Sequence, residues 1–485
     1  MSQKLLLTAA LTALTLSACA VGPTYTRPPE VPFAAQWLET GHSAAPEDAW
    51  WRSLHDPLLD DLVERTLQHN RDLKVAEAHL REARASRDAT AGQRLPQVDL
   101  TGSATANRLS KNGEIPIDHL PGFKRDLSLY DVGFDASWEI DLWGHQARAV
   151  EGATAREQAA AEALHDVQVS LIAEVVRSYV ELRSAQEQLA SATADAEAQE
   201  SIARLTGERF EGGESSRFDY ARAEAQALST RAAVPGFSAA AHAAAYQLAV
   251  LTGQPPEALT SLLETPAQVP RSPAVSSAGL RSDLLRRRPD VRQAERQLAA
   301  ATADVGVATS ELFPRLSLVG TYGQQAQNAS DLFSAGSNRF SVGPSLHWPV
   351  FAGGTIRANI RASNARADAA AATYEGAVLR ALGDSETAIN RFAAAQRTQQ
   401  DREVARLQSE EALGMARQRY RAGEDDLIVL LDAQSAYTVA DQQSIAARAA
   451  TLEALASMYK ALGGGWQSAA TAPVAARESC AAARC

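Results

Sequence analysis

Residues Arg419–Gln434 read RYRAGEDDLIVLLDAQ, and a fainter copy of this stretch begins about 210 residues earlier, at Arg209. In each copy a long helical pattern runs into a glycine, Gly213 or Gly423, and a second helical pattern follows. Glycine adopts the left-handed backbone that terminates many helices. Each copy therefore predicts a turn between two helices. The matching positions are Arg209 with Arg419, Phe210 with Tyr420, Gly213 with Gly423, Glu214 with Glu424, and Ala223 with Ala433.

The similarity between the two halves extends well beyond these turns. It persists at the same offset over more than a hundred residues, and further upstream the offset grows to about 218. A period this long indicates a duplicated unit of several elements rather than a solenoid repeat. The additional matches are Trp138 with Trp348, Gly144 with Gly354, Leu95-Pro96 with Phe313-Pro314, and Asn70 with Arg288.

The composition argues against several classes of function. The net charge of −11 and the pI near 5.4 disfavour a nucleic-acid partner, because no basic segment is concentrated enough to follow phosphates. The nine histidines are scattered, so we predict neither a metal site nor a cofactor. Glu139 and Asp141 lie close in the sequence but have no Gly-rich loop or His partner nearby, and we expect no enzyme.

The amino terminus carries an export signal. Lys4 supplies the positive charge, residues 5–16 form an apolar run, and Leu-Ser-Ala-Cys ends at Cys19. The run is too short to cross a bilayer as a helix, so it is typical of a cleaved signal peptide. A small-residue site that ends in Cys resembles a bacterial lipobox, in which Cys19 becomes the lipidated first residue of the mature chain. Ordinary cleavage beside an incidental cysteine is the alternative.

A proline-rich segment with Trp50 and Trp51 follows, which predicts an extended arm anchored by the two indoles. Asp56 is expected to cap a helix that runs to about Arg94. The predicted segments are a signal peptide (1–18), the lipid-anchored arm (19–55), a first repeat (56–253), a Pro- and Ser-rich equatorial linker (254–280), a second repeat (281–466) and a disordered tail with Cys480 and Cys485 (467–485).

Each repeat contains two stretches in which apolar and polar residues alternate, the pattern typical of β-strands. They predict β-hairpins over about 96–140 and 314–350, with strands of about ten residues, the length that a tilted strand needs to cross a bilayer. Four strands are too few to close a barrel, and lipid does not tolerate an open sheet edge. The chain is therefore expected to oligomerise.

Long helices are predicted over about 146–210 and 355–421, each roughly 100 Å in length at 1.5 Å per residue. Apolar residues recur along both at steps of three or four, which indicates an interhelical seam. Membrane strands joined to helices of this length would make a conduit. The seam residues include Leu171, Val175, Tyr179 and Leu182 in the first helix, and Val378, Leu382, Ile389 and Phe392 in the second.

A series of motifs occurs in a specific order along the chain. They are Gly22-Pro23 with Tyr25 and Arg27-Pro28, Trp50-Trp51 with Asp56-Pro57, Leu95-Pro96, Asp141-Leu142-Trp143-Gly144, Phe313-Pro314, Arg419-Tyr420 with Gly423, Leu431-Asp432-Ala433-Gln434, and Ala461-Leu462-Gly463-Gly464-Gly465-Trp466. Together they resemble the TolC family of outer-membrane efflux proteins, in the lipoprotein branch that serves RND-type pumps. The resemblance implies a mainly α chain that contributes four strands to a twelve-stranded membrane β-barrel in a homotrimer. A long α-helical barrel would continue it into the periplasm.

The same resemblance implies a function and partners. The chain would be a passive outer-membrane exit duct, lipid-anchored and extending into the periplasm. It would work with a periplasmic adaptor and an inner-membrane RND transporter, and export small toxic or amphiphilic compounds. The duct of a type I protein secretion system has the same architecture and is the alternative; the lipobox and the Ala-Leu-Gly-Gly-Gly-Trp ending favour the efflux branch.

Family members close the periplasmic end by polar contacts between neighbouring helices. Carried over by position, Asp432 and Arg419 match gate residues, and Arg222 is the first-half equivalent of Asp432. The alternative is that these are solvated charges at helix ends, each worth well under about 1 kcal/mol. The turns themselves are the candidate adaptor-docking tips, although turn chemistry alone also requires glycine there. The tip residues are Gly212, Gly213, Glu214, Ala422, Gly423 and Glu424.

Overall fold

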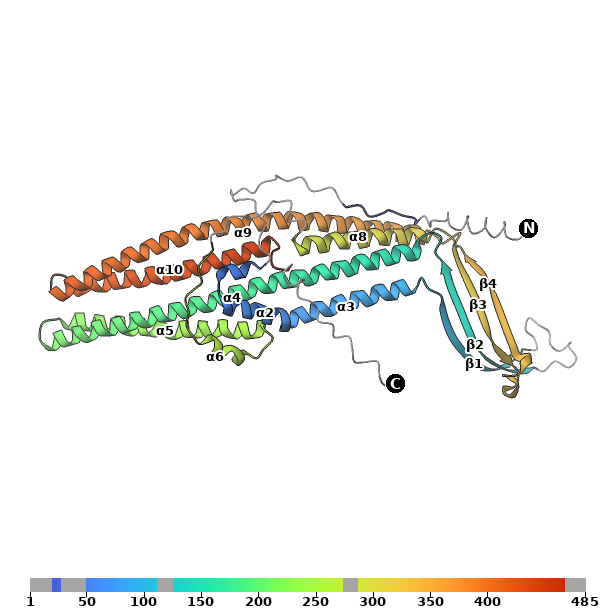
Figure 1. Cartoon of the computed structure of the whole chain (residues 1–485), viewed down its shortest axis with the longest axis horizontal. Coiled ribbons are helices and arrows are strands. Elements are labelled where there is room, and N and C mark those ends of the chain that lie inside the picture. Colours follow the sequence, from blue (N-terminus) through green and yellow to red (C-terminus); the bar gives the residue numbers. More distant parts are fainter. Residues whose placement is uncertain (1–19, 28–48, 111–124, 274–286, 467–485) are drawn as a thin grey trace. The chain divides into compact units, whose positions relative to one another are not determined.

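The computed structural model describes residues 20–27, 49–110, 125–273 and 287–466 (Figure 1). Cys19, the 467–485 tail and part of the predicted linker lie outside the described residues. The chain divides into two compact units. Among the described residues, one unit combines 20–27, 80–110, 125–159 and 294–374, and the other combines 49–79, 160–273, 287–293 and 375–466. Each unit therefore takes segments from both halves of the sequence.

The first unit contains an antiparallel sheet in the order β1-β2-β3-β4 (Figure 1). The four predicted strands are confirmed as β1 (Gln97–Arg108), β2 (Asp126–Ile140), β3 (Arg315–Ala326) and β4 (Asn338–His347). The pairing of β2 with β3 joins the strands of one half to those of the other. Among the described strands, β1 and β4 each pair with one neighbour, so the sheet has two open edges.

The sheet has one apolar and one polar face. Leu100, Phe134, Tyr322 and Phe340 lie opposite one another across all four strands, and each side chain is at least half exposed. Successive residues of a strand point to opposite faces, so their neighbours in sequence form the other face. There the Arg339 guanidinium binds the Asp131 carboxylate at 2.6 Å, and the Gln325 amide donates to the same carboxylate at 2.7 Å. The predicted alternation of apolar and polar positions is thus present across the sheet.

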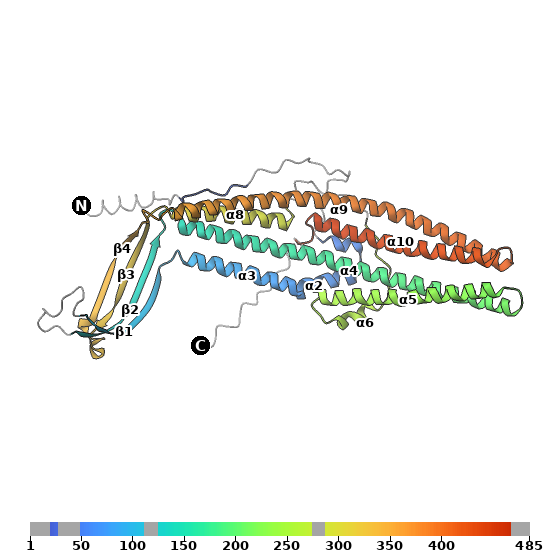
Figure 2. The same ribbon diagram turned by 180° about the vertical axis from the view of Figure 1, so that it is seen from behind.

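The two long helices are α4 (His145–Glu211) and α9 (Thr355–Ala422), with 67 and 68 residues. In both views α5 (Arg217–Leu251) lies beside the C-terminal part of α4, and α10 (Leu427–Ala461) lies beside that of α9 (Figures 1 and 2). The eight seam residues named above are buried, whereas Leu164, Val167 and Leu189 of the same predicted seam are half-buried. No helix in the described ranges contains a stretch long and apolar enough to cross a membrane. The shorter elements are η1 (Trp50–Leu54), η3 (Pro256–Leu259), α6 (Thr260–Leu263), α8 (Pro289–Ser310), η5 (Ala329–Asp331) and η6 (Ala335–Ser337).

The amino-terminal arm is fixed at two places. In the first unit, the Val21 N–H donates to the Trp143 carbonyl at 3.0 Å, and the Arg148 guanidinium donates to the Thr24 hydroxyl at 3.0 Å. In the second unit, Trp50 and Trp51 are buried, and the Trp50 ring stacks on Tyr459 with 4.8 Å between ring centroids. The paired indoles are therefore anchors, as predicted.

The single helix expected from Asp56 to about Arg94 is wrong, because the chain breaks at Asn70 into α2 (Pro57–His69) and α3 (Arg71–Gly92). The start was correct: the Asp56 carboxylate accepts the N–H groups of Leu58 and Leu59. Asn70 adopts a non-helical backbone, accepts the N–H of Leu73 at 3.1 Å and donates its amide to the Leu251 carbonyl at 2.9 Å. The break between the two helices thus coincides with a tertiary contact to the end of α5.

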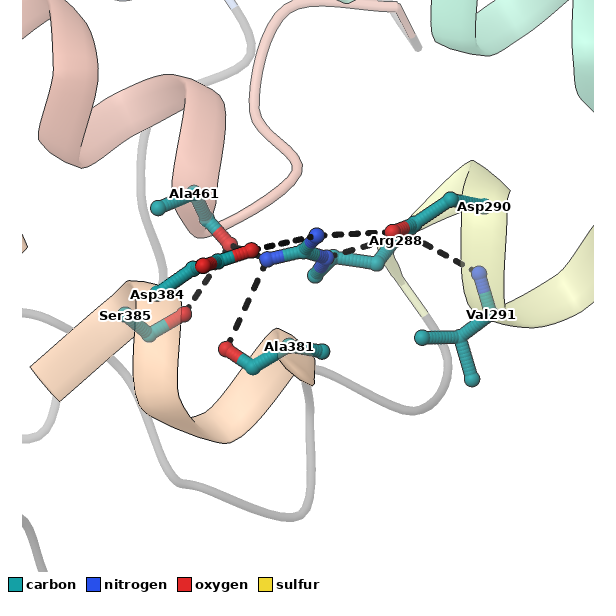
Figure 3. Close-up of polar contacts among 7 residues, drawn as sticks. All are labelled: Arg288, Asp290, Val291, Ala381, Asp384, Ser385 and Ala461. Carbon is teal, nitrogen blue, oxygen red and sulfur yellow. Dashed lines mark hydrogen bonds and ion pairs between the residues drawn. The ribbon is translucent and has the colours of Figure 1, made fainter. Parts of the chain in front are cut away.

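We call the place where the start of α3 meets the end of α5 a joint. The equivalent joint in the second half, where the start of α8 meets the end of α10, is built around Arg288 (Figure 3). Its guanidinium donates to the Ala461 carbonyl at the end of α10 at 3.2 Å. It also forms ion pairs with Asp290 at 2.7 Å and with Asp384 at 3.3 Å. Arg288 therefore ties the start of α8 to α9 and α10, at the position where Asn70 ties the start of α3 to α5.

Candidate functional site: the two interhelical turns

Both predicted turns end their helices in the same way. Gly213 and Gly423 have φ of +79° and +77°, the left-handed conformation that glycine adopts without a steric penalty. The Glu214 N–H donates back to the Arg209 carbonyl at 2.7 Å, and the Glu424 N–H donates to the Arg419 carbonyl at 3.0 Å. These bonds, with those from the glycine N–H groups, make each turn a Schellman motif. The backbone prediction for the turns is confirmed.

The helices that leave the turns are capped differently. Ser216 and Asp219 form a capping box at the start of α5, in which each side chain accepts the other residue's backbone N–H. Asp426 occupies the equivalent position before α10 but makes no side-chain cap. The nearby Asp425 carboxylate is instead bound by both Nε and Nη2 of Arg419, each at 2.9 Å. The second turn therefore uses one of its carboxylates to hold Arg419.

The three predicted gate residues differ in their surroundings. Arg419 is engaged with Asp425 inside its own turn, a partner that the sequence reasoning did not anticipate. Asp432 is exposed and Arg222 is half-buried, and neither makes a hydrogen bond or ion pair within the part of the chain that the structure describes. Arg222 and Asp432 are therefore not paired with each other inside one chain.

The six predicted tip residues are all exposed. A Cβ atom added to Gly213 or Gly423 would meet no atom within 4 Å, so both turns have open space around them. Phe218 and Ile428 occupy equivalent positions just after the two turns, and their side chains are 69% and 46% exposed. A hollow between the turns is lined by both of them and by Arg209, Arg222, Tyr420 and Asp425. The turns thus expose backbone groups, charged side chains and apolar side chains on one surface.

Contacts between the two helical pairs begin directly above the turns. The Arg209 guanidinium lies over the Tyr420 ring at 5.5 Å from its centroid. A cluster of buried apolar residues then joins all four helices. Its members are Ala203 from α4, Ala223 and Ala227 from α5, Leu413, Ala416 and Tyr420 from α9, and Leu427, Leu430 and Leu431 from α10.

A polar chain above this cluster was missed by the sequence reasoning. The Gln434 side chain is 2% exposed; its carbonyl accepts from the Arg417 guanidinium at 2.7 Å, and its NH₂ donates to the Asp195 carboxylate at 2.7 Å. The amide can accept from the cation through its oxygen and donate to the anion through its nitrogen at the same time. One turn further on, burial, followed by the carboxylate of Asp441, raises the pKa of Tyr437. The signal for this site was Gln434 itself, the last residue of the Leu-Asp-Ala-Gln motif.

Comparisons with known proteins cover nearly all of the chain. A family described as "Outer membrane efflux protein" matches residues 62–254 and 280–464, one range in each half. The pyoverdine export outer membrane protein OpmQ of Pseudomonas aeruginosa is 32% identical over 90% of this chain and 91% of its own length. The probable efflux pump outer membrane protein TtgC of Pseudomonas putida is 31% identical over 96% of each chain.

A solved structure has the same fold. The outer-membrane channel OprN is 39% identical to this chain, and the two superimpose with a TM-score of 0.84. The superposition covers 93% of this chain and 100% of the OprN chain. The predicted fold class, a mainly α, internally duplicated chain with four membrane-length strands, is therefore confirmed.

Proposed function

We propose that this chain, which belongs to the outer membrane efflux protein family, is the passive exit duct of a tripartite efflux pump. The predicted family and the outer-membrane location are confirmed by the family match and by the relatives. The matched proteins are export proteins and channels rather than enzymes. Lipidation of Cys19, the bounds of the six segments, and the adaptor and RND transporter as partners remain predictions.

The single observation that carries the proposal of a duct is the four-stranded sheet with an apolar face, a polar face and two open edges. An apolar face suits lipid, and a polar face suits a water-filled interior. Open edges are too costly in lipid, so β1 and β4 need strands from other copies. Three copies would supply the twelve strands of the predicted barrel, and the polar face with Asp131 and Arg339 would line it.

The function can be tested in a bacterial strain that lacks its own outer-membrane efflux channel but retains the rest of a compatible pump. Expression of this chain should restore export of a fluorescent amphiphilic dye and reduce its accumulation in the cells. Particle size in detergent should correspond to an elongated trimer. A monomer that restores no export would contradict the proposal.

We propose the two turns as the site where a periplasmic adaptor docks. The open space at Gly213 and Gly423, the exposed Glu214 and Glu424, and the apolar Phe218 and Ile428 support this. A photocrosslinking residue at Glu424 should capture a co-expressed adaptor in intact cells. The same residue at exposed Glu77 on α3 should capture none, and equal capture at the two positions would argue against docking at the turns.

We propose that Asp432, with Arg222 and Arg419, closes the periplasmic end of the assembled duct. Asp432 has no partner among the described residues of its own chain, which leaves its carboxylate available to a neighbouring copy. Asp432→Ala should raise the current through the open channel severalfold in a planar bilayer, because it removes a polar contact that holds the end closed. Asp426→Asn removes a charge from the same turn, at an exposed position that makes no side-chain cap, and should leave the current unchanged. An unchanged current in Asp432→Ala would exclude it from the gate.

A further inference from the structure

A small cavity lies between three helices, beside the polar chain of Asp195 and Gln434. Helices α4, α5 and α10 enclose it, and its volume is about 150 Å³. On each helix the lining residues recur at steps of three or four, so each helix turns one face to the cavity. Such faces are normally apolar where helices pack together. Here they are mostly polar, and the residues with oxygen in the side chain include Asp195, Gln199, Gln226, Thr230, Ser435 and Gln442.

Gln199 indicates that the cavity has an occupant. Its side chain is 1% exposed, and its Oε1 atom has no hydrogen-bond partner among the described residues. A buried polar atom without a partner is costly, and native proteins rarely contain one unless water or an ion binds it. Because an amide oxygen is only an acceptor, the occupant must supply either a hydrogen or a positive charge.

Asp195 adds a negative charge to the same cavity. It lies one helical turn before Gln199, is 8% exposed, and accepts from the Gln434 amide at 2.7 Å. A carboxylate has several acceptor sites, so Asp195 can bind further partners. Of the described residues that line the cavity, only Asp195 is charged, and Arg417 reaches it only through the neutral Gln434 amide. A buried carboxylate needs a balancing charge, which a cation from solution would supply.

The oxygen atoms around the cavity suit a hard cation. Carboxylate, amide and hydroxyl oxygens bind hard ions, whereas transition metals prefer His and Cys ligands. The Thr438 hydroxyl also lines the cavity, and it donates to the Gln434 carbonyl at 3.0 Å, so its oxygen keeps its acceptor sites. The described ranges contain no group of three or more His, Cys, Asp or Glu side chains able to hold a metal ion, which is the usual site of a multivalent ion.

The charge of the site selects a monovalent ion. A single positive charge balances the one carboxylate, whereas a divalent ion would leave a net positive charge buried between the helices. The volume leaves room for water molecules beside the ion, which would complete its shell of oxygen ligands.

We propose that this cavity binds a partly hydrated monovalent cation of the size of Na⁺ or K⁺, with Asp195 and Gln199 as its main ligands. The ion joins α4 and α5 of the first half to α10 of the second half. It therefore stabilises the packing of these helices within each chain. The site goes beyond the proposed duct, because it needs neither the sheet nor a second copy of the chain.

Thermal unfolding of the full-length, detergent-extracted protein tests the site. Chloride salts of Na⁺, K⁺ and N-methylglucamine are compared at equal ionic strength, because N-methylglucamine is too large to replace a small ion among these oxygens. Na⁺ or K⁺ should raise the unfolding temperature by about 2 °C, as expected of a ligand that binds only the folded state. Equal unfolding temperatures in the three salts would overturn the proposal. A rise with Mg²⁺ alone would overturn the monovalent assignment.

Two variants assign the rise to the cavity. Gln199→Met removes an acceptor at similar volume, and Asp195→Asn removes the charge but can still accept from Gln434. Both should lose most of the rise. In N-methylglucamine, Gln199→Met should be at least as stable as the parent, because it no longer buries an oxygen without a partner. Glu197→Gln, at an exposed position of α4 outside the cavity, is the matched control and should keep the rise. A full rise in both cavity variants would overturn the site.

Sodium NMR measures binding directly. The resonance of Na⁺ broadens when the ion exchanges with a site on a large, slowly tumbling particle. The excess line width should fall by about half or more in Asp195→Asn, because the bound fraction of Na⁺ falls, and should change little in Glu197→Gln. Both variants remove one negative charge, so general attraction to the acidic protein affects them equally. Equal line widths in the two variants would therefore overturn the proposal, and would mean that the cavity holds water only.

Discussion

The first half of the chain closes the joint at the end of α5 with the neutral amide of Asn70, whereas the second half closes the joint at the end of α10 with the guanidinium of Arg288. Both side chains donate to the last turn of a long helix, to the carbonyls of Leu251 and Ala461. Asn70 also caps α3, so one small buried residue satisfies two backbone groups. The carbonyl at the end of the helix thus receives its hydrogen bond from a neutral amide in one half and from a charged guanidinium in the other.

The charged Arg288 side chain is surrounded by further charged residues. A buried guanidinium is stable only when it is paired, and Arg288 binds Asp290 and Asp384. A pocket beside it is lined by these residues and by Asp166 and Lys460. The neutral joint is tight, whereas the charged joint lies beside a pocket and contains several titratable groups. The difference predicts that the two joints respond differently to added volume, to salt and to pH.

Added volume should separate the joints most strongly. Gly253, in the turn after α5, has φ of +74°, and a Cβ there would lie 2.4 Å from the His69 carbonyl oxygen. The equivalent Cβ at Gly463 would lie 3.0 Å from the backbone of Arg287. Gly253→Ala should lower the free energy of unfolding by about 3 kcal/mol, from the left-handed backbone and the displacement of His69. Gly463→Ala should cost clearly less.

The measurement is the midpoint of thermal unfolding in detergent, followed by far-ultraviolet circular dichroism. Gly213→Ala is the matched control, because it has the same backbone conformation with nothing within 4 Å, and it should cost only about 1 kcal/mol. Equal losses for Gly253→Ala and Gly213→Ala would mean that the neutral joint is not tightly packed.

Salt should distinguish the joints next. Asn70→Ala removes the α3 cap and leaves the Leu251 carbonyl without its donor, a loss of about 2 kcal/mol that does not depend on salt. Arg288→Met should cost about 1 kcal/mol at low salt, because Asp290 and Asp384 are partly exposed and regain water. That smaller loss should shrink further at high salt, where the ion pairs of the parent protein are screened. Thermal unfolding at two salt concentrations measures both, and a salt-dependent Asn70→Ala would contradict the neutral assignment.

The break at Asn70 also marks the limit of what the sequence alone predicts. The strands, the two turns and the long helices followed from local signals: alternation, glycine position and a period near 3.6. The residues from Asp56 to Arg94 carry a helical pattern throughout, and locally the interruption is marked only by Asn70, a residue type favoured at helix N-caps. It is caused by the Leu251 carbonyl, 181 residues away along the chain. Comparison of the two halves does not reveal the break either, because Asn70 is replaced by Arg288, a different side chain, at the equivalent position.

The candidate site shows the same division. The backbone of both turns was predicted in detail because glycine and the helix ends specify it locally. The partner of Arg419 was not, since Asp425 and Asp426 are adjacent carboxylates and only the folded turn selects Asp425. The bridge from Gln434 to Asp195 joins residues 239 positions apart, and no pattern in either helix identifies the pair. Long-range polar partners therefore required the structure.

The smallest expected effect concerns pH at the charged joint. Asp166 is half-buried in the pocket beside Arg288 and makes no hydrogen bond or ion pair with the described residues. Burial, and then the neighbouring carboxylate of Asp290, raises its pKa above the ordinary value of 3.8, against the opposing effects of Lys460 and Arg288. A carboxyl whose pKa is raised by folding favours the folded state when it is protonated. Its contribution is complete below the ordinary pKa and is lost as the pH rises through the raised value.

Asp166→Asn should therefore stabilise the protein slightly at neutral pH, because it removes a carboxylate that is costly to keep ionised in the pocket. The gain in unfolding temperature should decrease as the pH is lowered and vanish well below pH 3.8, where Asp166 is neutral in both states. Glu77→Gln, at an exposed position on α3, should show no such dependence. A variant that is less stable than the parent at neutral pH would mean that attraction to Lys460 and Arg288 outweighs burial, and that the charged joint needs Asp166 as a third carboxylate.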